Sequence, residues 1–323
     1  MQSRTSLLVA TLPFMLLWSE LGAAQPAYPS RSIEVVIPFP PGGPTDTAPR
    51  ILLEHLRPLL KATMVPSSKV GAGGAIGVEY VHRSTPDGHT ILATSNPALS
   101  VKTAIDKKVP YKIADFAAIG MYATDVGIIA ARRDLGIKTI DDLIARAKKN
   151  PDELSYASAG QGTVSHVSAE LFKTAAGVKI LHVPHRGSGP AVQAVLGGHV
   201  PLISAAFSSI APLIESGDLV PLITTASQRL PGLPDVPTFA ERGHADATLN
   251  IWMGFFVPAQ TPQPVVQVLA TALAQVAIDP AVTATIARAR MTPDYGDGTR
   301  ARQLLEKEYA IVTELAQKVQ LGE

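Results

Sequence analysis

Short apolar runs alternate along the chain with longer stretches whose apolar residues recur at helical spacing. Residues 32–37 are rich in β-branched side chains and predict a buried strand, and residues 47–56 carry apolar side chains at the spacing of one helix face. The same reasoning predicts strands at residues 64–66, 89–93, 116–122, 126–131, 154–157, 179–183, 200–204, 219–225 and 250–258, and later helices at residues 264–278, 281–289 and 300–319. Such alternation predicts an α/β fold on mostly parallel sheets, with a binding face at their carboxyl edges.

The first strand-to-helix turn carries the clearest candidate chemistry. Residues 38–46 read PFPPGGPTD. Thr45 or Asp46 is expected to cap the following helix, and Pro49 to lie in its first turn. Backbone N–H groups at such a helix start form a site for an anion without any charged side chain. A turn that holds no ligand remains the alternative.

The first 24 residues have the order of a secretory signal peptide. Arg4 precedes an apolar run at residues 7–18, and Gly22-Ala23-Ala24 supplies a small-residue cleavage site. The run is too short for a comfortable membrane span. We therefore expect cleavage after Ala24 and a periplasmic protein, with a retained N-terminal anchor as the alternative.

Composition excludes several classes of function. Lys plus Arg number 28 and Asp plus Glu number 27, so no strong field attracts nucleic acid. The chain has no Cys, which removes disulfides, thiol nucleophiles and thiolate metal sites. Residues 71–77 superficially match a dinucleotide fingerprint, but Ile76 occupies the third glycine position. We therefore predict no nucleotide cofactor.

The histidines and serines do not assemble into a predicted metal or catalytic site. His182 and His185 flank Pro184 as the chain leaves a strand, which is not the spacing of a helical metal pair. No serine lies in a G-x-S-x-G elbow, so His166 is expected to contact ligand or to pack rather than to act as a base. The sequence thus predicts no metal, no cofactor and no catalytic residue.

Several segments in a fixed order carry a family resemblance. They are Tyr28-Pro29-Ser30-Arg31, the turn at residues 38–46, Gly71-Ala72-Gly73-Gly74, Pro86-Asp87-Gly88-His89-Thr90, residues 156–166, His182-Val183-Pro184, Arg186-Gly187-Ser188, residues 233–238 and residues 258–262. Together they resemble the Bug-type extracytoplasmic solute receptors, the binding components of tripartite tricarboxylate transporters. The match spans essentially the whole chain after residue 24.

The resemblance implies a two-domain Venus-flytrap fold of the type II-like kind, without catalysis. One domain is expected from residues 25–127 plus 251–323, and the other from residues 128–250 inserted within it. Residues 126–131 and 252–257 are expected to connect and hinge the two domains. The ligand is expected between them, in contact with Phe39, Gly42, Gly43, Thr45, Asp46, Thr94, Ser95, Asn96, Ser158, Ala159, Gly160, Gly162, Thr163, His166, Arg186, Gly187, Ser188 and Phe207.

Departures from the family pattern shape the ligand prediction. Pro201 and Ala205 stand where the family usually has two acids, so no partner for a ligand amine is expected there. Arg186 lies beside Gly187-Ser188 at a predicted helix start, where a guanidinium can hold a carboxylate. An exposed Arg without a ligand is the alternative. We expect a small dicarboxylate without an amine.

The resemblance also implies partners. A monomeric receptor that delivers its ligand to the permease subunits of a tripartite transporter is the leading expectation, without nucleic acid as a partner. A receptor that presents its ligand to a sensor kinase, and an exported enzyme on the same scaffold, are the alternatives, because a fold does not fix a function.

Overall fold

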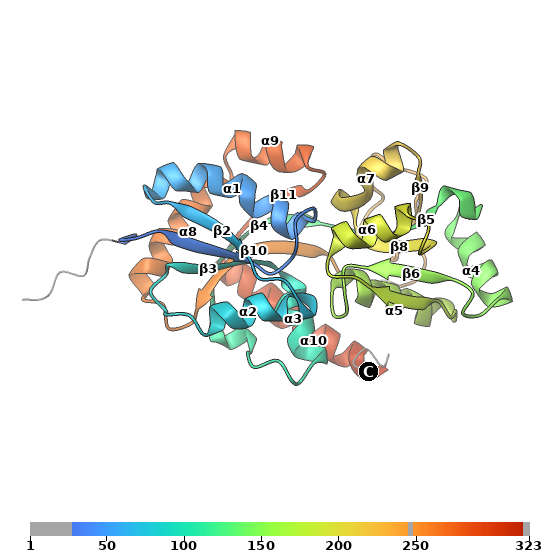
Figure 1. Cartoon of the computed structure of the whole chain (residues 1–323), viewed down its shortest axis with the longest axis horizontal. Helices are drawn as coiled ribbons and strands as arrows, with labels where there is room; N and C mark the ends of the chain where they lie inside the picture. The colour runs from blue at the N-terminus through green and yellow to red at the C-terminus, as the bar shows by residue number, and fades with distance from the viewer. Residues whose placement is uncertain (1–27, 245–247, 319–323) are drawn as a thin grey trace, which may run out of the picture.

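The computed structural model describes residues 28–244 and 248–318, so the predicted signal peptide lies outside the described residues. The chain forms two lobes side by side, each around one sheet (Figure 1). The first sheet has the strand order β11-β4-β10-β3-β1-β2. Its strands are β1 (Ile33–Ile37), β2 (Met64–Ser68), β3 (Thr90–Ser95), β4 (Phe116–Asp125), β10 (Ile251–Pro258) and β11 (Thr292–Asp297).

The second sheet is built from the middle of the chain. Its strand order is β7-β6-β8-β5-β9. Its strands are β5 (Gly127–Arg132), β6 (Ser155–Ser158), β7 (Leu181–Pro184), β8 (Leu202–Ala206) and β9 (Leu219–Thr224). The two-sheet α/β architecture agrees with the prediction from sequence.

The strand directions differ from the expected mostly parallel sheets, because both sheets are mixed. β1 pairs in parallel with β2 and β3, and β6 pairs in parallel with β7 and β8. The pairings of β10 and β5 with their neighbours are antiparallel. The reason is the path of the chain: β4, β5 and β10 lead into and out of the second lobe, and a strand that returns from it runs against the strand that left.

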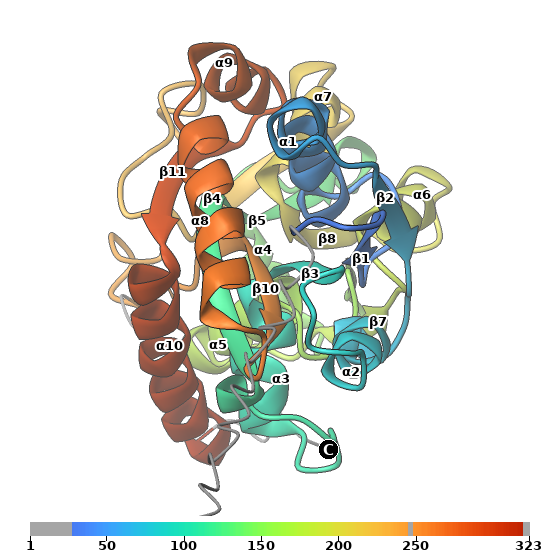
Figure 2. The same ribbon diagram turned by 90° about the vertical axis from the view of Figure 1, so that its left-hand side faces the viewer.

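Helices cover both faces of each sheet. The first lobe contributes α1 (Pro44–Leu60), α2 (Ala75–His82), α3 (Ser100–Ile105), α8 (Gln263–Ala277), α9 (Pro280–Arg288) and α10 (Gly298–Lys318). The second contributes α4 (Ile140–Lys149), α5 (Val164–Ala176), α6 (Ser188–Leu196) and α7 (Phe207–Glu215). Figure 2 shows α1 and α9 above the first sheet and α2, α3 and α10 below it.

Successive side chains of a strand point to opposite faces of its sheet, so neighbouring residues of the central strands belong to different hydrophobic clusters. Val35 packs in the cluster with α1 and α8, and Val36 packs in the cluster with α2 and α10. Because both faces are buried, these strands are rich in apolar residues. Within the described residues no single helix is long and apolar enough to span a membrane, and the pair α8 and α9, bent by 69°, meets that criterion only jointly.

Helix α1 begins earlier than predicted. Its N-cap is Gly43 and its first residue is Pro44, so the expected caps Thr45 and Asp46 lie inside the first turn. Pro44 suits this position because it lacks the N–H that would have no intrahelical acceptor. Pro49, expected in the first turn, instead lies within the helix.

The connections between the lobes differ from the predicted segments, and the first is shorter than predicted. β4 ends at Asp125 in the first sheet and β5 begins at Gly127 in the second, so Val126 alone joins them. The return path leaves β9 at Thr224 and enters β10 at Ile251. The expected connecting segments 126–131 and 252–257 thus lie almost wholly inside the sheets, next to the crossings.

Candidate ligand-binding site

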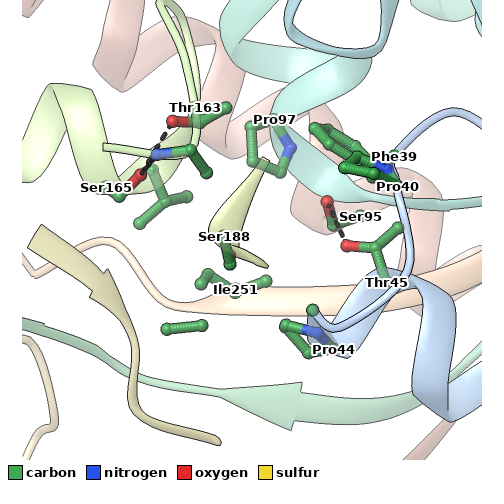
Figure 3. Close-up of a pocket in the computed structure, with 14 residues that line it drawn as sticks. Phe39, Pro40, Pro44, Thr45, Ser95, Pro97, Thr163, Ser165, Ser188 and Ile251 are labelled. Carbon is green, nitrogen blue, oxygen red and sulfur yellow. Dashed lines mark hydrogen bonds between the residues drawn. The ribbon is translucent and has the colours of Figure 1, made fainter. Parts of the chain in front are cut away.

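A pocket lies between the lobes where loops from both meet (Figure 3). Its cavity volume is about 40 Å³, and it is partly open to solvent. The first lobe lines it with Phe39, Pro40, Gly43, Pro44, Thr45, Ser95, Pro97 and Ile251. The second lobe lines it with Ala159, Thr163, Val164, Ser165, Ser188 and Ala206.

Three helices begin at this pocket. Gly43 is the N-cap of α1, Thr163 is the N-cap of α5, and Ser188 is the first residue of α6. The first N–H groups of a helix have no intrahelical acceptor, and the helix dipole places partial positive charge there. None of the fourteen lining residues is charged. The pocket can therefore attract an anion through backbone dipoles and hydroxyl groups.

Hydrogen bonds within each lobe fix the hydroxyl groups of the pocket. Thr45 Oγ1 lies 3.1 Å from Ser95 Oγ in the first lobe (Figure 3). In the second lobe, Thr163 Oγ1 donates to the Gly160 carbonyl at 2.7 Å and lies 2.9 Å from Ser165 Oγ. Since the Thr163 proton is used by Gly160, Ser165 is the donor of that pair. These bonds hold the hydroxyl groups in place before a ligand arrives.

The rims of the two lobes are in contact, so the pocket is in a closed arrangement. A Cβ atom on Gly187 would lie 2.3 Å from Pro40 of the opposite lobe, and one on Gly73 would lie 2.6 Å from the Gln161 carbonyl oxygen. Both glycines have positive φ, at 125° and 66°, which other residues rarely adopt. Glycine is therefore required at both positions for this close approach of the lobes.

A second pocket adjoins the first across Phe39 and Ala159, which line both. Its cavity volume is about 320 Å³, and it is lined by the glycine run at residues 70–74 and by three basic residues. Lys102 is buried and its Nζ lies 2.7 Å from Asp106 Oδ2. Arg186 is exposed. His185 Nε2 is buried and has no hydrogen-bond partner among the described residues. No acidic residue lines this second pocket.

A stack of three rings supports the second lobe's part of the site. His182 lies between Tyr156 and His166, with ring centroids 4.8 and 4.4 Å apart. Burial lowers the pKa of His182 to about 4 and also lowers the pKa of His166. Both rings are thus neutral near neutral pH. Ser158 Oγ bonds His182 Nε2 at 2.6 Å, and the Gly162 N–H bonds His166 Nδ1 at 3.3 Å.

The structure divides the predicted site residues into three groups. Seven line the first pocket: Phe39, Gly43, Thr45, Ser95, Ala159, Thr163 and Ser188. Gly160 and Arg186 line only the second pocket. The others line neither pocket: Gly42, Asp46, Thr94, Asn96, Ser158, Gly162, His166, Gly187 and Phe207.

Several of the residues outside the pockets have other contacts. Asp46 is buried in the first turn of α1 and bonds Arg50 at 2.8 Å. Gly42 approaches Gly189 of the opposite lobe. Ser158 and His166 belong to the ring stack described above.

Asn96 is part of a network at the second crossing that sequence reasoning missed. Its side chain donates to the Asn250 carbonyl at 3.0 Å and to Glu308 Oε2 at 2.9 Å, and it accepts from the Trp252 N–H at 3.0 Å. Ser100 Oγ and Trp252 Nε1 also donate to the Glu308 carboxyl, at 3.0 and 2.7 Å. Glu308 of α10 therefore ties the start of β10 to α3.

The first crossing carries a second acid that the sequence pattern did not indicate. Asp125 is only 3% exposed, and its Oδ1 accepts from the Val126 N–H at 2.8 Å and from the Ser208 N–H at 3.4 Å. Its Oδ2 is buried without a hydrogen-bond partner among the described residues. Burial raises the pKa of Asp125 to about 7.

The described residues contain no group of three or more His, Asp or Glu side chains placed to hold a metal ion. The chemistry that the site offers is recognition through backbone N–H groups, hydroxyl groups and the nearby basic side chains.

Two lobes that close over a pocket at converging helix N-termini define a binding protein of the periplasmic class. Residues 49–321 match the tripartite tricarboxylate transporter family receptor. The chain belongs to this family, and it is a periplasmic solute-binding receptor of the Bug type.

Solved structures agree with this assignment. The periplasmic binding protein BugD is 33% identical, with a TM-score of 0.85, and the match covers 91% of this chain and 99% of BugD. Rpa4515 of R. palustris, solved with adipate, is 28% identical, with a TM-score of 0.85 and coverage of 91% and 98%. MatC of Rhodopseudomonas palustris, solved with bound malate, is 27% identical, with a TM-score of 0.84 and coverage of 89% and 99%.

Proposed function

We propose that this receptor captures a small dicarboxylate without an amine and delivers it to the permease subunits of a tripartite tricarboxylate-type transporter. The observation that carries the proposal is the uncharged pocket where α1, α5 and α6 begin. A helix N-terminus binds a carboxylate without a charged side chain as its partner. Here the N–H groups of three helix N-termini are available to one carboxylate. The solved relatives with adipate and malate support a dicarboxylate.

The second carboxylate is assigned to the adjoining pocket. Arg186 and His185 line it and have no ion-pair partner among the described residues, whereas Lys102 is engaged by Asp106. A ligand that passes between Phe39 and Ala159 would present one carboxylate to the helix N-termini and the other to Arg186. A guanidinium suits this role because its fork matches the two carboxylate oxygens.

An amine is excluded from the proposal on electrostatic grounds. An ammonium group that is removed from water needs an acidic or strongly accepting partner. No acid lines either pocket, and Asp125, the buried acid at the first crossing, is not among the lining residues. The three helix N-termini would also repel a cation.

A thermal-shift screen of mono-, di- and tricarboxylates, including aromatic ones, tests the ligand class. Binding to the native state alone adds about 2.7 kcal/mol to the free energy of unfolding at a hundredfold excess over Kd. We expect dicarboxylates to raise the melting temperature most and aspartate less than malate. Equal stabilisation by aspartate and malate would contradict the exclusion of an amine.

Arg186→Ala tests the second carboxylate. A hydrogen bond to a charged group contributes roughly 1.5–3 kcal/mol, so binding of the best dicarboxylate should weaken by roughly tenfold to a few hundredfold. Arg186→Lys should restore only part of the affinity, because the fork geometry is lost. Lys179→Ala, which removes an exposed cation of the same lobe outside both pockets, is the matched control. Titration calorimetry that gives Arg186→Ala the parent affinity would make Arg186 a surface residue.

Delivery requires export. We propose that residues 1–24 are removed and that the receptor is a periplasmic monomer. Mass spectrometry of the periplasmic fraction should find a chain that begins at Gln25, and light scattering should give the mass of one chain. An intact N-terminus in the membrane fraction would contradict removal of the leader.

A further inference from the structure

Asp125 joins the two lobes through its carboxyl group at the point where the chain first crosses between them. It is the last residue of β4, and Val126 alone separates it from β5. Its Oδ1 accepts from the Ser208 N–H in the first turn of α7, a helix of the second lobe. The Phe207 N–H, also at the start of α7, donates to the Val126 carbonyl at 2.8 Å. The crossing thus holds the N-terminus of α7.

The carboxyl group is only half satisfied. Oδ2 has no hydrogen-bond partner among the described residues, although the residue is buried. A buried carboxylate that lacks partners is costly, whereas the neutral acid is far less so. In this closed arrangement the group therefore favours the protonated form. A movement at Val126 that admits water to Oδ2 would favour the carboxylate.

The surroundings do not offer a countercharge. β10 places Ile251 opposite Asp125, and α7 presents Ser208. The charged residues of the adjoining elements are occupied elsewhere: Glu215 at the far end of α7 pairs with Arg290, and Arg132 at the far end of β5 pairs with Asp134. Glu308, at the second crossing, is bonded by Asn96, Ser100 and Trp252.

We propose that Asp125 is a positioning residue that links closure of the lobes to the uptake of one proton. Protonated Asp125 stabilises the closed arrangement, and ionised Asp125 favours opening at Val126. This inference rests on the proposed function, because closure on a ligand is the event that the proton would control.

The sign of the effect follows from linkage. A carboxyl group whose pKa is higher in the closed than in the open state takes up a proton on closing, so closure becomes less favourable as pH rises. The pKa of about 7 in the closed state sets the upper end of this range. As pH rises toward that value, affinity for malate should fall by at most about tenfold per pH unit. Above that value, affinity should stay constant.

The test measures malate affinity by calorimetry, and the radius of gyration with and without malate, between about pH 5 and pH 9. The parent and Asp235→Asn, which removes an exposed acid of the second lobe, should show the pH dependence. Asp125→Asn and Asp125→Val, which imitate the neutral state in different ways, should not show it. Titration of malate itself is common to all four proteins, and circular dichroism confirms that each is folded.

The two proposals can fail separately. If malate binds none of the four proteins, this dicarboxylate is not the ligand, and the ligand-free radius of gyration still tests Asp125. That radius should grow with rising pH in the parent and stay constant in Asp125→Asn. The parent and both Asp125 variants could instead show the same pH dependence of malate affinity or of the ligand-free radius of gyration. That result would overturn the proposal that Asp125 links closure to proton uptake.

Discussion

The two crossings between the lobes each hold an acid, and the two acids have opposite surroundings. At the second crossing, Glu308 receives hydrogen bonds from Asn96, Ser100 and Trp252. At the first crossing, Asp125 Oδ1 accepts from the backbone N–H groups of Val126 and Ser208, and Oδ2 has no hydrogen-bond partner among the described residues. Loss of water raises the pKa of both acids, but only Glu308 has side-chain donors from three separate elements to oppose that rise.

The comparison indicates that the two crossings have different mechanical roles. A carboxyl group bonded by three side chains fixes their positions, since movement of any one leaves a polar group unsatisfied. A carboxyl group with a free oxygen is held less tightly and responds to protonation. The second crossing is thus expected to act as a fixed anchor, and the first as the place where the lobes move.

The largest expected effect comes from removing the anchor. Glu308→Ala leaves the side-chain donors of Asn96, Ser100 and Trp252 without their acceptor. Because each unsatisfied buried group costs about 1–3 kcal/mol, the free energy of unfolding should fall by about 3–5 kcal/mol. Urea unfolding followed by circular dichroism measures the change.

Glu306→Ala is the matched control, because Glu306 is exposed on the same helix and forms no part of the network. It should change the free energy of unfolding by less than about 0.5 kcal/mol. A similar loss in both variants would mean that removal of an acidic side chain from α10, and not the loss of the network, explains the result.

An intermediate effect is expected from Asp125→Asn. The pKa of Asp125 is raised in the folded chain from 3.8 to about 7, so the folded state binds more protons between those values. Stability is therefore lost as pH rises through this range, by up to about 1.4 kcal/mol per pH unit. Asp125→Asn should flatten this slope and be the more stable protein at pH values above 7. Unfolding curves across the range with an unchanged slope would refute the assignment.

The smallest expected effect comes from the far end of α7. Arg290 of the first lobe lies 2.6 Å from Glu215, and both side chains are about half exposed, at 50% and 55%. Such an exposed pair contributes about 0–1 kcal/mol and is screened by salt. Arg290→Ala should lower the melting temperature slightly at low salt and not at all at high salt. A large loss that persists in high salt would place a third anchor here.

Local patterns predicted most of the fold because they act over a few residues. The apolar run at 32–37 and the following glycine turn identified β1 and the start of a helix. β11 (Thr292–Asp297) was missed because its sequence, TPDYGD, has little hydrophobic character and its pairing depends on the edge offered by β4. The mixed strand directions were missed because they depend on how the chain returns between lobes.

The site was predicted only in part, for a related reason. Thr45, Thr163 and Ser188 lie at helix starts, which the sequence marks. Val164, Ala206 and Ile251 line the same pocket but carry no polar signal, since only the docking of two lobes brings them there. Asp125 and Glu308 were missed likewise: each follows ordinary strand or helix residues, and their environments exist only after the lobes assemble.

Solution scattering with and without a dicarboxylate tests the central claim, that the receptor closes on its ligand around the first crossing. Malate or adipate should reduce the radius of gyration of the parent to the value calculated from this closed structure, with a parallel rise in melting temperature. Glu306→Ala should behave in the same way. A ligand that raises the melting temperature while the radius of gyration stays unchanged would contradict closure and leave a receptor that binds without moving.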